Sequence, residues 1–392
     1  MPAIYRVGVL LFLSLSLSAQ DAYYQHFYGN EADYNPAMVG QRGAMRLGIS
    51  YRTQWYATDA QQYTTQKVTF EESLPCFFLD YGLFARQDEE GEGKLTTTEF
   101  GGRIAAAFPL SKKNADDVLN LRVGFGLAFG QRSVDFSKLT FLDQLDPFFG
   151  LVDENGNANP TGFQSPLNGG ASPRYSTPSF GVSLKGGLNR SSKRPLTFDV
   201  GIAVHNLGLF VNPDSRQSAS LLGLDNALGE RWVFTALADV VFARDARRRY
   251  WSARPSLVIQ EQEGLRYAEF GSGLSWNKTV NVGAYYHVSY DNADSANNES
   301  WTSLQLEIGD RLGQSDTRLD IAFSYAFQFG FLKNYVRPPL EVTATFSFGK
   351  STTCMLMGYG DEAVMSRRNA TSCFNFTTAR NRLYDNIWYR EQ

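Results

Sequence analysis

The stretch LDIAFSYAFQF, residues 319–329, alternates large apolar side chains with small or polar ones without a break. In an extended chain Phe323 and Phe327 fall on one side, while Asp320 and Ser324 fall on the other. A period of two residues is typical of a β-strand whose faces meet different surroundings. The stretch therefore predicts a strand with one apolar face and one polar face.

The same alternation recurs along the chain, most clearly in residues 119–130 and 340–348. Runs of about 9–11 residues are long enough to cross a bilayer at a tilt, and they exceed the average soluble strand. Their polar faces are rich in Gly, Ser and Thr, as a barrel lumen allows. A soluble sandwich would also alternate, but strand length and the small polar residues favour a membrane barrel. Aromatic residues near strand ends are expected at the membrane interfaces: Tyr51, Trp55, Tyr286, Tyr290 and Trp301.

Counting these runs predicts an all-β fold, a transmembrane antiparallel barrel of about fourteen strands within residues 44–349. The predicted strands are 44–58, 62–73, 76–88, 94–109, 118–134, 176–190, 195–209, 230–244, 249–262, 264–276, 278–291, 300–312, 316–331 and 337–349. If the N-terminus is periplasmic, the short turns face the periplasm and the two longest connections, 135–175 and 208–229, face outward.

The connection 135–175 is rich in Gly, Asn and Pro, yet it carries a cluster of Leu and Phe residues. Long connections in compact domains are usually functional or disordered. The cluster is expected either to fold into the barrel mouth or to meet a partner. A plain surface loop is the alternative.

The N-terminus predicts export. Residues 1–19 combine a positive Arg6, an apolar run from Val7 to Leu17 and a small-residue site at Ala19, which is typical of a cleaved signal peptide. A buried N-terminal helix is the alternative. Residues 20–43 are rich in Tyr, and we expect this periplasmic segment to lie against the periplasmic mouth or within the lumen. Together these features predict a multi-pass outer-membrane protein in contact with outer-membrane lipid.

A tail, residues 350–392, follows the last predicted strand and is expected in the periplasm. It contains Cys354 and Cys373, which are expected to form a disulfide in an oxidising compartment. Closing this loop would stabilise the ordered state by ~3 kcal/mol. Two free thiols are the alternative.

The search for chemistry is negative. The net charge is −3 and no basic stripe appears, so the sequence predicts no nucleic-acid partner. His287 and Ser289 share one strand face, a weak match to a hydrolase pair. Asp153, Asn155 and Asn157 imitate the start of a calcium loop but lack its later ligands. We therefore predict no catalytic residue, no cofactor and no metal site.

The segment after the signal peptide carries Tyr34-Asn35-Pro36-Ala37 and Gly40, followed by Tyr51-Arg52 and Gln54-Trp55. These residues resemble the N-terminal signature of the PorP/SprF family of outer-membrane proteins, associated with type IX secretion and gliding motility. The stretches 180–182 and 201–207 are similar to later strands of that family. The resemblance implies a barrel that exports or anchors a secreted surface protein, often an adhesin, and that contacts other secretion and motility components. A diffusion channel or small-solute transporter is the alternative function.

Elementary physics suggests roles for the signature. Pro36 favours an extended entry, and Gly40 permits a backbone bend before the first strand. Arg52 and Gln54 are expected to face the lumen, where they pair with the N-terminal segment or with an acid such as Glu307, and Trp55 is expected to face lipid. The signature serves either to seat the first strand or to bind a partner.

Overall fold

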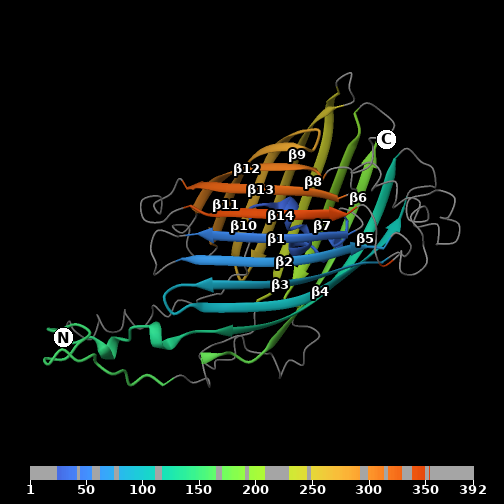
Figure 1. Ribbon diagram of the computed structural model, residues 1–392. Helices are drawn as coiled ribbons and strands as arrows, with labels where there is room; N and C mark the ends of the chain where they lie inside the picture. The colour runs from blue at the N-terminus through green and yellow to red at the C-terminus, as the bar shows by residue number, and fades with distance from the viewer. Residues whose placement is uncertain are drawn as a thin grey trace, which may run out of the picture.

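The computed structural model describes residues 24–41, 45–54, 62–74, 79–110, 117–164, 170–189, 194–207, 229–244, 249–291, 299–312, 317–328, 338–348 and 353. Trp55, Cys354 and Cys373 lie outside these residues. Fourteen strands form one closed antiparallel barrel in which each strand pairs with its neighbours in sequence and β1 pairs with β14 (Figure 1). The predicted fold class is confirmed, and the strand bounds agree with the predicted segments to within a few residues.

The strands are β1 (Met45–Gln54), β2 (Tyr63–Ser73), β3 (Leu79–Glu90), β4 (Leu95–Pro109), β5 (Val118–Ser133), β6 (Tyr175–Leu188), β7 (Leu196–His205), β8 (Arg231–Arg244), β9 (Tyr250–Gln262), β10 (Leu265–Trp276), β11 (Val280–Asp291), β12 (Glu299–Arg311), β13 (Thr317–Gln328) and β14 (Leu340–Phe348). No helix among the described residues is long and apolar enough to span a membrane.

The alternation in the sequence separates the two faces of the wall. On β13, Phe323 and Phe327 are exposed on the outside, while Ser324 is buried in the lumen. The register places Ser324 opposite Glu341 of β14, so both polar residues share the inner face. Trp301 departs from the prediction of an interfacial position. It lies on the lumen side of β12 and its ring stacks on His287, with centroids 5.2 Å apart.

The lumen is occupied by the chain's own N-terminal segment. Residues 24–41, called the plug below, contain the short turns η1 (Phe27–Gly29), α2 (Glu31–Tyr34) and η2 (Pro36–Met38). Every residue of the plug except Gly29 is buried. Its apolar side chains form a core with inward residues of β7, β8 and β9: Phe27, Tyr28, Tyr34, Met38, Ala203, Val233, Leu237 and Val258. Burying one large apolar side chain contributes about 1.5–3 kcal/mol, so this core holds the plug firmly.

Candidate functional site

The most informative part of the molecule is the contact between the plug and the wall, where the signature residues lie. Asn35 begins η2: its Oδ1 accepts a hydrogen bond from the backbone N of Ala37 at 2.9 Å. Its Nδ2 donates to the backbone oxygens of Val182 at 3.1 Å and Ile202 at 3.4 Å. Pro36 occupies the first position of the turn, where a missing N–H costs nothing. One Asn side chain therefore caps the plug turn and fastens it to two strands.

Three glycines on adjacent strands receive this turn. A Cβ on Gly124 of β5 would overlap the backbone of Pro36 and Ala37, and a Cβ on Gly181 of β6 or Gly201 of β7 would overlap the Asn35 side chain. Gly124 and Gly181 are register partners. The missing side chains let the plug lie directly on the wall. All three glycines lie inside strands, and the sequence alone does not show that the plug packs against them.

Arg122 of β5 holds the C-terminal end of the plug. Its Nε donates to the backbone oxygen of Ala37, and its Nη2 to that of Val39, both at 2.7 Å. The same guanidinium forms an ion pair with Asp80 at 3.0 Å. At Gly40 the backbone turns with φ of +67°, a conformation that glycine adopts without strain. The predicted bend at Gly40 is therefore present, and it leads the chain out of the lumen towards β1.

A charged cluster holds the middle of the plug. The carboxylate of Asp33 forms ion pairs with Lys67 of β2 and with Arg103 of β4, the latter at 2.6 Å. Lys67 also donates to the side chain of Asn30. Burial opposes ionisation of Asp33, but the charges of Lys67 and Arg103 outweigh it and hold the pKa of Asp33 well below its usual range. Charge-assisted bonds of this kind are about twice as strong as neutral ones.

Glu341 of β14 anchors the start of the plug. Its carboxylate accepts from the backbone N of Gln25 at 2.5 Å and from Asn30 Nδ2 at 3.1 Å. Arg52 is buried opposite Glu341, its register partner, and donates to Gln54 Oε1 at 2.6 Å. Glu307, the acid suggested for Arg52, instead forms an ion pair with Arg254 at 2.9 Å.

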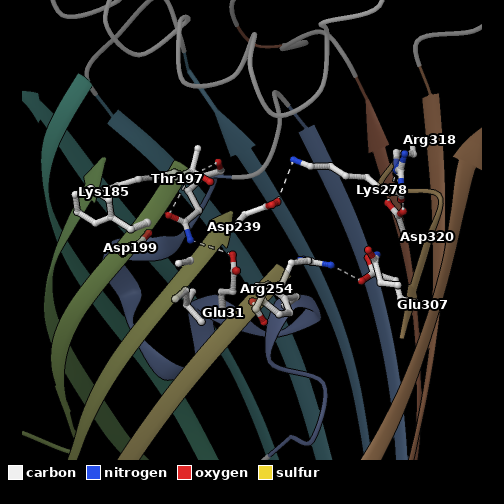
Figure 2. Close-up of a pocket in the computed structure, with 16 residues that line it drawn as sticks. Glu31, Lys185, Thr197, Asp199, Asp239, Arg254, Lys278, Glu307, Arg318 and Asp320 are labelled. Carbon is white, nitrogen blue, oxygen red and sulfur yellow. Dashed lines mark hydrogen bonds and ion pairs between the residues drawn. The ribbon is translucent and has the colours of Figure 1, made fainter. Parts of the chain in front are cut away.

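The plug separates two hollows. The first, of about 700 Å³ including open solvent, is lined by Glu31 of the plug and by wall charges near the short turns. Figure 2 shows these charges in pairs: Arg254 with Glu307 at 2.9 Å, and Lys278 with Asp239 at 3.6 Å. The second hollow, of about 460 Å³, lies on the other side of the plug and has a mostly polar lining. On β6, Lys185 lines the first hollow and Ser179 the second, with the docked Gly181 between them.

One wall cluster has the composition of a hydrolase site. His287 Nε2 lies 2.7 Å from Ser303 Oγ, while its Nδ1 lies 2.6 Å from Tyr267 Oη and 3.4 Å from Glu269. The hydroxyl beside His287 Nε2 is therefore that of Ser303 on the neighbouring strand β12. The side chains of His287, Ser303 and Glu269 are at most 1% exposed, and none of them lines either hollow. They form a buried polar network that stiffens the wall between β10, β11 and β12.

Arg122→Gln is expected to loosen the C-terminal end of the plug, because each bond from a charged donor contributes about 1.5–3 kcal/mol and two backbone oxygens lose theirs. Chymotrypsin cleavage after Tyr34 should become at least roughly a hundredfold faster in the folded, detergent-solubilised protein, since the two bonds together contribute about 3 kcal/mol or more and each 1.4 kcal/mol corresponds to tenfold. Arg266→Gln is the matched control, since Arg266 forms an exposed ion pair with Glu261. Equal cleavage rates in both variants would contradict the assigned role of Arg122.

Comparison with known proteins supplies the context for this site. The family model described as type IX secretion system membrane protein PorP/SprF matches residues 16–346. No curated protein gives a significant match. Solved structures with a similar fold include the CymD monoaromatic hydrocarbon channel, at 12% identity, TM-score 0.39, covering 85% of this chain and 96% of that one. The toluene transporter TodX of Pseudomonas putida is 10% identical, with a TM-score of 0.37, and the match covers 85% of this chain and 95% of that one. The β domain of the Bordetella autotransporter BrkA is 12% identical, with a TM-score of 0.33, and the match covers 78% of this chain and 99% of that one.

Proposed function

We propose, from the premise that this chain belongs to the PorP/SprF family of type IX secretion system membrane proteins, that it binds a secreted surface protein and exports or anchors it. It is a multi-pass outer-membrane β-barrel. We further propose that it acts without catalysis or cofactor, and that its partner is an adhesin or another type IX substrate, with periplasmic or outer-membrane secretion components as further contacts.

The observation that carries this proposal is the plug. A diffusion channel needs a continuous polar path, whereas here buried residues and ion pairs bridge the lumen from β2 to β9. The hollows on either side of the plug share no lining residue. A barrel whose lumen is filled from within offers its mouths and connections as binding surfaces. This favours an interaction protein over the channel alternative.

The proposal assigns a direction to the barrel. We place the mouth with the short turns in the periplasm and the mouth with the long connections outside, as bacterial barrels are usually arranged. In this arrangement the signature residues fix the plug and the first strand in place, and the partner proteins bind at the two mouths of the barrel. Contacts with secretion machinery belong to the periplasmic mouth, and contacts with a surface protein belong to the outer one.

Deletion of the chain from its own cells tests the proposal. Surface biotinylation with mass spectrometry should show that one or a few large secreted proteins fall at least tenfold at the cell surface, while other outer-membrane proteins are unchanged. Complementation with the full chain should restore them. An unchanged set of surface proteins together with slower uptake of a small solute would instead establish the channel function.

A further inference from the structure

The connection between β5 and β6 forms an ordered arm. Figure 1 shows this segment, in green, extending beyond the barrel rim at the lower left. We define the arm as residues 135–164. At its base, the backbone N of Asp135 donates to the oxygen of Gly93, in the turn between β3 and β4, at 2.8 Å.

The arm is held by its own contacts. The ring of Phe163 stacks on that of Phe141 at 4.4 Å between centroids. The carboxylate of Asp143 accepts from the backbone N of Gly162 at 2.6 Å. Gln144 and Asn159 exchange bonds of 3.0 and 2.9 Å between their side-chain amides and backbone oxygens. The two halves of the arm are thus joined along their length.

The tip of the arm presents apolar side chains outward. Asp146 and Gly150 close a turn with reciprocal backbone bonds of 2.6 and 3.0 Å, and Gly150 has φ of +74°. The Asp146 carboxylate accepts from the backbone N of Phe148 and of Phe149. Phe148 is 90% exposed and Leu142 is 85% exposed. Further exposed apolar side chains of the arm are Leu145, Phe149, Leu151 and Val152.

An apolar cluster of this kind marks an interaction site. Its backbone is already fixed by the turn, so binding would cost little ordering entropy, and aromatic side chains are the usual anchors of protein interfaces. The arm carries five carboxylates and one lysine. Such an acidic surface is repelled by anionic lipid headgroups and fits a protein groove with a basic rim.

We propose that the arm tip is the docking element for the secreted surface protein, inserting Phe148 and Phe149 into an apolar groove rimmed by Lys or Arg residues of that protein. This inference rests on the proposed function and names the surface that performs it. The exposure of Phe148 argues against the expected role of folding into the barrel mouth. Partner docking and a plain surface loop are separated by the experiment below.

The test uses a photoreactive amino acid at Leu142 of the full chain in intact cells. The expected result is an adduct with the same protein whose surface level falls when the chain is deleted. Phe148→Ser combined with Phe149→Ser should reduce that adduct roughly tenfold or more, since interface anchors typically dominate binding. Glu154→Lys should reduce it several-fold by charge repulsion at the basic rim. The photoreactive residue at Lys138, exposed at the base of the arm and away from the tip, is the matched control and should give little adduct.

Adducts only with lipid, or only with a second copy of this chain, would overturn the inference. So would normal surface retention of the partner by the double Ser variant. These outcomes leave the proposed function intact, because that function fails only if deleting the whole chain changes no surface protein. Both Phe side chains are exposed, so the variant should keep the heat stability of the wild-type barrel.

Discussion

Replacing Asp33 with Ala is expected to lower the unfolding free energy of the barrel by about 3–5 kcal/mol, because two buried cations would lose their compensating charge. Lys67 and Arg103 both form ion pairs with this carboxylate inside the lumen. The shift is measured as the urea midpoint of the detergent-solubilised barrel, followed by tryptophan fluorescence.

Two companion variants make this result specific. Asp135→Ala removes an exposed carboxylate that pairs with Lys138, and it should leave the midpoint unchanged. Adding Lys67→Met to Asp33→Ala should recover part of the loss, because the uncompensated charge disappears. An Asp33→Ala midpoint equal to that of wild type would mean that the plug is not held by this cluster.

Gly124→Val is expected to weaken the contact between the plug and the wall. The added side chain would occupy the space of Pro36 and Ala37, and overpacking of a tight contact typically costs about 1–3 kcal/mol. Amide exchange in residues 30–41 should therefore accelerate by roughly five- to 150-fold, since each 1.4 kcal/mol corresponds to tenfold. Mass spectrometry of peptic peptides measures this directly.

Gly102→Val provides the control for that experiment. Gly102 lies on the neighbouring strand β4, and a Cβ there would meet the Leu83 side chain at 3.5 Å and the Gly82 backbone oxygen at 3.7 Å, both ordinary contacts. Exchange in the plug should be the same as in wild type. If Gly102→Val accelerated exchange as much as Gly124→Val, the effect would come from general weakening of the wall.

The wall was predictable and the plug contacts were not, for a physical reason. Alternate residues of a strand such as β13 face lipid and lumen, so neighbours in the sequence such as Phe323 and Ser324 already indicate which side each occupies. The turn at Asn35 packs against Gly124, Gly181 and Gly201, which are far apart in sequence. A glycine has no side chain whose chemistry could indicate what packs against it. Only the closed register brings the three glycines together.

The same limit explains the errors at individual side chains. Trp301 was expected at the membrane interface because it lies near a strand end, yet the strand parity turns it inward onto His287. His287 was grouped with Ser289 on its own strand, but the register of β11 with β12 supplies Ser303 instead. Cross-strand partners depend on register, which a single sequence does not reveal.

The most direct test of the central claim is the ion conductance of the purified full-length barrel in a planar lipid bilayer. With the plug seated, the wild-type protein should give no steady conductance, and Gly124→Val should show more frequent transient openings. A steady open-channel current through the wild-type barrel would contradict the sealed lumen and return the protein to the class of diffusion channels.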